Sequence, residues 1–435
     1  MIRTALTSIL VIAGTIEPAS AETITVCAEG CDYTSINDAI DAASNGDLIQ
    51  LAAETYFEGE QIDTLGKAIT LRGVLGSDGE PASVLDGAGT HRVLICRSGE
   101  TSETSLVNLV VRNGYSGTGA GMYNQRCSPT LENCRFMNNS AATDAGAMYN
   151  LVSSPVLIDC TFEGNSADTS GGMTNYDRSN PNMTRCIFQG NSASVGGGML
   201  NLASSSPVLT DCVFRENSAG YFCGGMFNLG DSSPNLIECR FEGNSSLGNH
   251  GGMLNAEGSA PILVDCTFAY NSAARGGGMS NQEDSMPTVS GCSFVHNSAE
   301  IGGGMYNASG SAPVLIDCAF SYNSAVMGGG IWSGAGSPTL ADCTLCDNAP
   351  DQIDGSWNDA GGNCVSISCD DCDLPSDPCP TDLDQNGITD GGDLGAFFIS
   401  WGECRVEDCL ADFNDDDVVD GIDLGILFSA WGPCQ

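Results

Sequence analysis

Two short stretches near the C-terminus carry oxygen-bearing side chains at the spacing that wraps a loop around a calcium ion. Calcium prefers six to eight hard oxygen ligands, and a loop of about 12 residues supplies them from positions 1, 3, 5, 7, 9 and 12, with a backbone carbonyl at position 7. The first loop offers Asp382, Asp384, Asn386, Ile388, Asp390 and Asp393. The second offers Asp412, Asn414, Asp416, Val418, Asp420 and Asp423. An apolar run follows each loop (Leu394–Trp401 and Leu424–Trp431), so the sequence predicts two loop–helix units that bind two Ca²⁺ ions rather than a solvated acidic tail.

A second set of carboxylates recurs along the body of the chain, directly before a cysteine that repeats at a near-constant interval. Asp211, Glu238 and Asp265 are three consecutive members, and Arg215 lies close to them in sequence. Cleavage of a sugar chain needs either paired carboxylates or a cation site with a strong base. These four residues are therefore candidates for catalysis, and the alternative is a solvated charged face.

The body that would position these acids is built from copies of one stretch. Ser154–Asn175 reads SPVLIDCTFEGNSADTSGGMTN, and its skeleton recurs nine times with cysteines 25 to 27 residues apart. Cys and Phe two residues apart lie on one face of a strand, and the proline and paired glycines mark bends. One copy cannot bury its apolar face alone, so the copies must stack at about 4.8 Å per turn. The repeats predict an all-β parallel solenoid with about 26 residues per turn.

In such a solenoid, equivalent residues of successive copies form columns. The pattern predicts buried columns of cysteine, phenylalanine and methionine, and two asparagine columns. The first asparagine column falls at a bend, where its side-chain amides can satisfy backbone groups, and the second follows each methionine by two residues. The cysteines are Cys134, Cys160, Cys186, Cys212, Cys239, Cys266, Cys292, Cys318 and Cys343; the others run from Phe136 to Phe320, Met148 to Met305, Asn139 to Asn323 and Asn150 to Asn307. Stacked cysteines are spaced more widely than a disulfide prefers, so we expect buried thiols.

Composition and the N-terminus indicate the compartment and the class of partner. The chain has 435 residues, with 14 Lys and Arg against 55 Asp and Glu, and a formal net charge of −41. Nucleic acids and anionic membranes are bound through basic patches, so neither is expected as a partner. Residues 1–21 have a positive start, an apolar run and a small-residue end, which is typical of a secretory signal, and no other segment predicts a membrane span. We expect a protein that is secreted or held at a bacterial cell surface.

Cysteines outside the column are expected to form disulfides in an exported chain. Cys27 and Cys31 are close in sequence, and four more crowd residues 364–379, where Cys369 and Cys372 have half a zinc site as the alternative. The C-terminal module allows either Cys379–Cys404 with Cys409–Cys434 or Cys379–Cys434 with Cys404–Cys409. The sequence suggests no partner for Cys96, Cys127, Cys223 and Cys346.

The N-terminal part of the body is less regular than the repeats. Thr34–Ala43 has apolar residues at helical spacing after a Ser/Thr cap, and predicts a short helix that covers the open end of the solenoid. The predicted organisation is a signal peptide (1–21), a parallel β-helix (22–350, with N-terminal turns at 22–118 and regular repeats at 119–350), a linker (351–378) and a calcium module (379–435).

Two resemblances to known families follow from these motifs. The N-terminal part resembles secreted right-handed β-helix proteins of the pectin-lyase-like superfamily in the order of its segments: a capping helix, then DLIQLAAETYFE, AITLRG, SVLDGAG and LVNLVVRNGYSGTGAGMYN. The repeats resemble those of polymorphic outer-membrane proteins. The duplicated loops resemble a type I dockerin, an EF-hand-like module that docks onto a cohesin. Asp417 replaces a loop glycine, and Gly391-Gly392 and Gly421-Ile422 replace the Ser-Thr pairs common in cohesin-binding dockerins, so the resemblance implies calcium binding and leaves a cohesin-like partner open.

The resemblances imply two classes of function for the body. One is a glycan-binding or adhesive surface that holds a polysaccharide or cell-surface glycan, tethered by the calcium module. The other is a polysaccharide lyase or glycoside hydrolase, but the polygalacturonase motifs of the superfamily are absent from the body, and no copy carries an inserted loop that would wall a cleft. We expect a glycan binder, with polysaccharide degradation as the alternative, and isolated surface positions for His250 and His296. The expected contact residues are Tyr123, Tyr149, Tyr176, Tyr221 and Tyr306.

Overall fold

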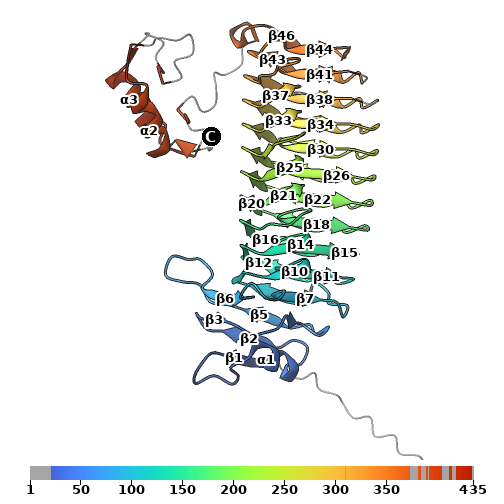
Figure 1. Cartoon of the computed structure of the whole chain (residues 1–435), viewed down its shortest axis with the longest axis vertical. Coiled ribbons are helices and arrows are strands. Elements are labelled where there is room, and N and C mark those ends of the chain that lie inside the picture. Colours follow the sequence, from blue (N-terminus) through green and yellow to red (C-terminus); the bar gives the residue numbers. More distant parts are fainter. Residues whose placement is uncertain are drawn as a thin grey trace, which may run out of the picture.

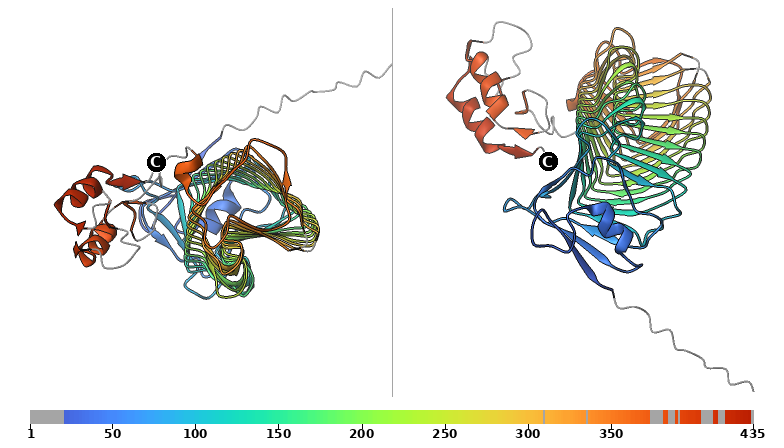
Figure 2. Two further views of the ribbon diagram at one scale, coloured as in Figure 1. Left: turned by 90° about the horizontal axis from the view of Figure 1, so that it is seen from above. Right: turned by 60° about the horizontal axis from the view of Figure 1, so that its bottom comes forward.

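The body of the protein is a stack of parallel-stranded turns. The structure is a computed structural model that describes residues 21–308, 310–334, 336–372, 381–383, 388–389, 391–403, 411–413 and 418–433. Figure 1 shows the turns rising from the N-terminal helix to the last strands, and Figure 2 shows them superimposed when viewed along the stack. Each strand pairs in parallel with the equivalent strand of the next turn, as Phe162 does with Phe188. The expected all-β solenoid with about 26 residues per turn is confirmed.

Three long parallel sheets, A, B and C, form the walls. Sheet A contains β1 (Thr23–Val26), β2 (Leu48–Leu51), β5 (Thr70–Arg72), β8 (Ser105–Val107), β12 (Thr130–Glu132), β16 (Val156–Ile158), β19 (Asn182–Thr184), β23 (Val208–Thr210), β27 (Asn235–Ile237), β31 (Ile262–Val264), β35 (Thr288–Ser290), β39 (Val314–Ile316), β42 (Thr339–Ala341) and β45 (Asn358–Asp359). Sheet B contains β3 (Thr55–Tyr56), β6 (Ser83–Asp86), β9 (Leu109–Arg112), β13 (Arg135–Met137), β17 (Thr161–Glu163), β20 (Ile187–Gln189), β24 (Val213–Arg215), β28 (Arg240–Glu242), β32 (Thr267–Ala269), β36 (Ser293–Val295), β40 (Ala319–Ser321), β43 (Thr344–Cys346) and β46 (Cys364–Val365). Sheet C contains β4 (Ile62–Asp63), β7 (Leu94–Cys96), β11 (Met122–Gln125), β15 (Met148–Leu151), β18 (Met173–Tyr176), β22 (Met199–Leu202), β26 (Met226–Leu229), β30 (Met253–Asn255), β34 (Met279–Asn281), β38 (Met305–Asn307), β41 (Ile331–Ser333) and β44 (Ile353–Gly355).

A lateral sheet lies between sheets B and C along the chain and comes in two pieces. They are β10 (Tyr115–Thr118) with β14 (Ser140–Asp144), and β21 (Ser192–Val195), β25 (Ser218–Phe222), β29 (Ser245–Ser246), β33 (Ser272–Arg275) and β37 (Ser298–Ile301). Leu200, Phe227 and Leu254, on the face of sheet C that points away from the main core, form a second small core with Cys223 and Val195. The lateral strands thus cover part of sheet C, which a simple three-walled coil would leave open to water.

The predicted buried columns are confirmed. The phenylalanines from Phe136 to Phe320 are fully buried and stack with ring centroids 4.4 to 5.1 Å apart. The nine column cysteines are buried free thiols, and burial raises the pKa of Cys160 well above its ordinary value. A protonated thiol in this position behaves as a small apolar side chain, so the cysteines fill space rather than crosslink turns.

Both expected asparagine ladders are present, the first at the bend that follows the strands of sheet B and the second within the strands of sheet C. In the first ladder Asn191 Oδ1 accepts hydrogen bonds of 3.0 Å from both the backbone N–H and the Nδ2 of Asn165. In the second ladder each Nδ2 donates to the next Oδ1, beginning with Asn124 to Asn150 at 2.8 Å and ending at Asn307. A third ladder, of serines that accept from backbone N–H groups, begins with Ser153 Oγ bound by Cys127 N–H, and we did not predict it.

A short helix closes the N-terminal end of the core. α1 (Ile36–Ala42) buries Ile36, Ala39 and Ile40, and the side chain of Ser35 caps it by accepting from the N–H of Asp38. Glu58 accepts from the N–H of Ile36 at 2.8 Å, which neutralises part of the positive end of the helix dipole. The predicted capping helix is confirmed within the expected residues 34–43.

The solenoid extends beyond the boundary expected at residue 350. β44, β45 and β46 pair with β41, β42 and β43, so part of the segment expected to be a linker adds a further turn. Its few apolar residues are compensated by the disulfides Cys346–Cys369 and Cys364–Cys372, the latter spanning the 3₁₀ helix η1 (Cys369–Cys372). The expected Cys27–Cys31 disulfide is also present, and Cys369 and Cys372 are each disulfide-bonded to another cysteine rather than paired as half a zinc site.

The C-terminal module contains two helices that follow the two predicted calcium loops. α2 (Gly391–Ile399) and α3 (Gly421–Ser429) start three residues before the expected Leu394 and Leu424, and Phe397, Val419 and Leu427 form its core. Two short antiparallel pairs join the halves: β47 (Ile388–Thr389) with β50 (Gly432–Pro433), and β48 (Gly402–Glu403) with β49 (Val418–Val419). Residues 1–20 of the expected signal peptide and the cysteines 379, 404, 409 and 434 lie outside the described residues.

Candidate functional site

The three repeated acids that were candidates for catalysis occupy one backbone position in successive turns. Asp211, Glu238 and Asp265 lie in the bend between sheets A and B with φ of 51°, 54° and 52°, the left-handed region in which Asn, Asp and Gly are favoured. Their N–H groups continue the interturn ladder, as Asp211 does to Ile237 O at 2.9 Å. Every turn holds this bend position in the left-handed region, as Arg185 does with φ of 52°, so the alignment of the three acids follows from the fold, and all three are exposed.

Arg215, the fourth candidate, is not joined to these acids. Its Nε and Nη2 donate to Gln189 Oε1 at 3.0 and 2.6 Å on sheet B. Among these four residues, all described, no ion pair forms, whereas Arg185 binds Asp159 through two hydrogen bonds of 2.7 and 2.8 Å. The expected cation-and-base arrangement is not assembled in the structure.

The expected tyrosine surface is also different from the sequence interpretation. Tyr123 and Tyr149 stack with centroids 5.6 Å apart, and the Arg92 guanidinium lies 4.9 Å above the Tyr123 ring. Tyr176 is not their neighbour, because Tyr149 pairs with Thr174 and Tyr176 pairs with Leu151. Tyr221 is exposed, but Tyr306 is buried against Trp332 at 4.6 Å.

The two histidines were expected to be isolated surface residues, and neither is isolated. His250 is buried, with its Nδ1 2.7 Å from Ser280 Oγ and its Nε2 2.8 Å from Gln282 Nε2. Burial lowers the pKa of His250 to about 3, so this ring is neutral. His296 is partly exposed and stacks between Tyr270 and Tyr322, 5.0 and 5.1 Å away.

A hollow of about 500 Å³ lies near the N-terminal end of the body, and we call it the aromatic hollow. It lies where strands of sheet B end and the lateral sheet begins. Its lining residues are Phe57, Asp86, Ala88, Gly89, Asn113, Gly114, Tyr115, Asn138 and Ser140. Phe57 is 65% exposed and Tyr115 is 48% exposed, so both rings are available to a ligand.

Turn geometry brings these residues together. Asp86 ends β6, Tyr115 begins β10, and Asn138 follows β13, so equivalent bends of three turns contribute to the floor. Asn113 and Asn138 occupy this bend with φ of 53°, again in the left-handed region. Asparagine tolerates that backbone and also offers a side-chain amide, so one residue type serves both the fold and the recess.

The floor of the aromatic hollow carries one fixed negative charge. Asp86 is 5% exposed and accepts from Arg112 Nε at 2.7 Å and from Asn113 Nδ2 at 2.9 Å. Burial raises the pKa of Asp86, but hydrogen bonds from Ala88 N–H, Arg112 and Asn113 outweigh it and hold the pKa below its ordinary value. The carboxylate is therefore ionised, and Arg112 balances its charge.

This arrangement is suited to a polyhydroxylated ring. Two exposed aromatic rings present apolar faces, and beside the internally bonded Asp86 carboxylate the Asn113 and Asn138 amides can both donate and accept. A few placed polar groups beside aromatic walls are typical of small-ligand sites. Sequence reasoning missed the hollow because Phe57, Asp86 and Tyr115 lie in irregular turns, although the quoted stretches SVLDGAG and VRNGY contain most of its floor.

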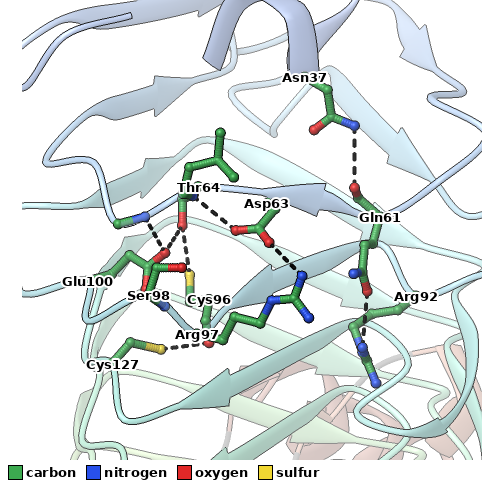
Figure 3. A network of polar contacts seen from close by, with 12 residues as sticks. Asn37, Gln61, Asp63, Thr64, Arg92, Cys96, Arg97, Ser98, Glu100 and Cys127 are labelled. Carbon is green, nitrogen blue, oxygen red and sulfur yellow. Dashed lines mark hydrogen bonds and ion pairs between the residues drawn. The ribbon is translucent and has the colours of Figure 1, made fainter. Parts of the chain in front are cut away.

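A smaller hollow of about 230 Å³ lies beside α1 and differs in character. Its lining residues are Asn37, Asp41, Glu60, Gln61, Asp63, Leu65 and Arg97, none of them aromatic. Arg97 Nη2 lies 3.3 Å from Asp63 Oδ2, a contact visible in Figure 3. Most of its side chains are polar or charged, and no aromatic ring lines it on which a sugar could pack. We therefore favour the aromatic hollow as the candidate site.

The predicted calcium ligands are described in part. Asp382, Asp393 and Asp423 are buried, and Asp423 accepts from Phe413 N–H and Asp420 N–H at 2.8 Å each. Ile388, Asp412 and Val418 are described and partly exposed. The remaining candidates Asp384, Asn386, Asp390, Asn414 and Asp416 lie outside the described residues.

Comparison with known proteins identifies the fold family. Residues 88–241 and 224–416 match the family model described as right handed beta helix region. The chain belongs to this right-handed β-helix family. No curated protein matches the chain significantly in sequence.

Solved structures with a similar chain path are distant in sequence. A mannuronic acid specific polysaccharide family 6 lyase from human gut microbiota has 10% identity and a TM-score of 0.42, covering 80% of this chain and 84% of that chain. A pectate lyase has 11% identity and a TM-score of 0.36, covering 82% of this chain and 86% of that chain. A tailspike protein of an Acinetobacter baumannii bacteriophage, a capsular polysaccharide depolymerase, has 11% identity and a TM-score of 0.34, covering 73% of this chain and 57% of that chain. These likenesses concern the path of the chain, and the functional argument below depends on this chain's own residues.

Proposed function

We propose that this right-handed β-helix protein binds a polysaccharide or cell-surface glycan in the aromatic hollow. The observation that supports this is the pairing of two exposed rings, Phe57 and Tyr115, with the polar floor formed by Asp86, Asn113 and Asn138. The apolar C–H faces of a sugar ring pack on aromatic rings, and its hydroxyls pair with carboxylates and amides. The open form of the recess suits a chain that passes across it rather than a small molecule that is enclosed.

Binding is favoured over cleavage by the number of acids in the hollow. Among its lining residues, all described, Asp86 is the single carboxylate, and Arg112 already neutralises it. Glycoside hydrolysis by the common route needs two carboxylates, one of them protonated. Polysaccharide degradation by a lyase or glycoside hydrolase is retained as the second candidate, on the strength of the family resemblance alone.

The test is a binding screen of the full chain against neutral and acidic polysaccharides, with Ca²⁺ present. Phe57→Ala and Tyr115→Ala should each weaken binding about tenfold, because losing about 1.4 kcal/mol of contact changes an affinity by that factor. Tyr221→Ala is the matched control, since it removes an aromatic ring that is 66% exposed elsewhere on the body. Equal losses in all three variants, or in none, would remove the hollow as the site.

The same screen separates binding from degradation. New reducing ends or unsaturated products, formed by the parent chain and lost in Asp86→Asn, would support an enzyme. Binding without products supports the glycan-binding proposal. If neither occurs, both candidate functions fail for the substrates in the panel.

We also propose that the C-terminal module binds two Ca²⁺ ions. The donor set fits, because Asp393 and Asp423 at position 12 of the two loops are fully buried carboxylates, and Asp423 is held in place by two backbone N–H groups. Further oxygens in the first loop would come from Asp382 and Ile388, and in the second from Asp412, Val418 and Asp420. The candidates outside the described residues would supply the rest. Bound calcium would neutralise acids that are otherwise costly to bury.

Calorimetry of the full chain tests the calcium proposal. We expect heat from two sites, half of it lost in Asp423→Ala and all of it in Asp393→Ala/Asp423→Ala. Asp177→Ala, which removes a partly exposed acid of the body that pairs with Arg178, is the control. Retention of both sites in the double variant would contradict the proposal.

The module and the N-terminus together suggest how the protein is placed. Phe398 and Phe428 near the ends of α2 and α3, and Trp401 and Trp431 just beyond those ends, are about half exposed, as a surface for a cohesin-like protein partner would require. Within the described residues, no helix has both the length and the apolar character needed to cross a bilayer. We propose export to the extracellular space or a bacterial cell surface, with the module as the tether.

A further inference from the structure

Three residues break the repeat at the point where two side-chain ladders begin. Cys96 pairs with Asn124 in register and so occupies the position that asparagine holds in the following turns. Cys127 heads the serine ladder, donating its backbone N–H to Ser153 Oγ at 3.2 Å. Glu100 follows Cys96 by four residues and extends into the same place, where Figure 3 shows the three side chains together.

The three side chains form a compact buried cluster. The Sγ atoms of Cys96 and Cys127 and a carboxylate oxygen of Glu100 all lie within 4.8 Å of one another. The three residues are 1%, 2% and 2% exposed, in the order Cys96, Cys127 and Glu100. Thr64 Oγ1 adds a neutral oxygen, 3.3 Å from Cys96 Sγ and 2.7 Å from Glu100 Oε1.

Among the described residues, no cationic side chain forms an ion pair with the carboxylate in this cluster. Glu100 accepts hydrogen bonds from Thr64 Oγ1, Gly66 N–H and Ser98 N–H, at 2.7 to 2.9 Å. Arg97, the neighbouring cation in sequence, turns away and pairs with Asp63. A buried charge is costly unless it is paired or coordinates a metal, so a cation next to both thiols would stabilise the site.

We infer that Cys96, Cys127 and Glu100 form a binding site for a thiophilic divalent cation of the Zn²⁺ class. Three atoms that lie within 4.8 Å of one another have a common point at most about 4.8/√3 = 2.8 Å from each. Zinc–sulfur and zinc–oxygen bonds of about 2.3 and 2.0–2.2 Å therefore need side-chain shifts of at most about 0.5 to 0.8 Å. Thr64 Oγ1 and Asn124 Oδ1, 3.8 Å from Cys127 Sγ, are the oxygens that can complete a four-ligand shell.

Coordination would exchange protons for the metal. Each thiol loses its proton, so that one Zn²⁺ replaces two H⁺, and no electron transfer or oxidant is involved. The competing chemistry is a Cys96–Cys127 disulfide, which would need an oxidant to remove two electrons and two protons and would leave Glu100 unpaired. The cluster of three donors favours the metal over the disulfide.

The repeat itself supplies a variant that should fold. Cys96→Asn and Cys127→Ser each introduce the residue that the same position carries in later turns, namely Asn150 and Ser153. The double variant C96N/C127S extends both ladders by one step and removes both sulfur ligands. Glu100→Gln tests the carboxylate, and Cys223→Ser removes a buried free thiol that lies in the second core.

The full chain is produced under reducing conditions with Zn²⁺ or Co²⁺ in the medium, dialysed against a weak chelator and analysed for metal content and absorption. We expect one zinc per chain and, with cobalt, a sulfur-to-cobalt charge-transfer band. Both should be lost in C96N/C127S, be weakened in Glu100→Gln and persist in Cys223→Ser. The proposal is overturned if the parent chain retains no metal, if C96N/C127S retains it, or if peptide mapping without reduction finds a Cys96–Cys127 disulfide.

Discussion

The most quantitative prediction concerns Asp144, at the end of β14 beside the stacked tyrosines. Thr174 Oγ1 donates to its carboxylate at 2.6 Å, yet burial raises the pKa of Asp144 from its ordinary value of 3.8 to about 6. Burial and the nearby Asp144 carboxylate also raise the pKa of Tyr149 to about 12. The ionised form of Asp144 is therefore disfavoured in the folded protein.

The sign and size of the effect follow from linkage. Because the folded-state pKa is the higher one, Asp144 does not destabilise the fold below about pH 4, and its ionisation costs stability as the pH rises to about 6. A shift of about two units corresponds to about 3 kcal/mol at most. Asp144→Asn removes the charge and keeps an oxygen for Thr174, so it should stabilise the protein by about 2 kcal/mol at pH 8 and leave it unchanged at pH 4.

The assay is denaturant unfolding of the parent and variant at pH 4, 6 and 8. Asp168→Asn is the matched control, because Asp168 is an exposed acid that accepts from Ser194 Oγ at 2.9 Å. The control should change stability by less than about 0.5 kcal/mol at every pH. A gain from Asp144→Asn that is the same at pH 4 and pH 8 would refute the argument, since an uncharged effect does not depend on pH.

Three further predictions concern the ladders and the repeated acids. Asn191→Ala should destabilise the protein by roughly 4 kcal/mol, at about 1 kcal/mol for each of its four side-chain hydrogen bonds, whereas exposed Asn182→Ala should have little effect in the same unfolding assay. Ser333→Asn should raise the free energy of unfolding by about 1 kcal/mol, because Asn307 Nδ2 and Ser333 Oγ are buried without a partner among the described residues and the longer amide would extend the ladder. A lower free energy of unfolding would show that the amide does not fit. The triple variant D211N/E238Q/D265N should keep full glycan binding in the polysaccharide screen. A loss of glycan binding in this variant would show that these acids contribute to the binding site.

The repeats allowed the fold to be predicted in unusual detail. A fixed period requires like residues to stack, so the Phe column, the thiol column and both asparagine ladders followed from spacing alone. The serine ladder was missed because single serines between bends are common in loops. The final turn was missed because its residues are mostly polar and two disulfides hold it in place, which spacing does not reveal.

The candidate site was harder to predict than the fold, for a physical reason. The repeated acids drew attention because they recur, yet their alignment follows from a left-handed bend that any turn of this solenoid needs. The aromatic hollow is instead formed once, by Phe57, Asp86 and Tyr115 from irregular turns far apart in sequence. Its composition was visible in the sequence, but its assembly depends on the register of three turns.

A structure of the full chain bound to an oligosaccharide of the tightest-binding polysaccharide tests the glycan-binding proposal most directly. The proposal predicts a sugar ring packed against Phe57 or Tyr115, with hydroxyls within hydrogen-bonding distance of Asp86, Asn113 or Asn138. An oligosaccharide bound instead along the bend of Asp211, Glu238 and Asp265, with the aromatic hollow empty, would contradict it.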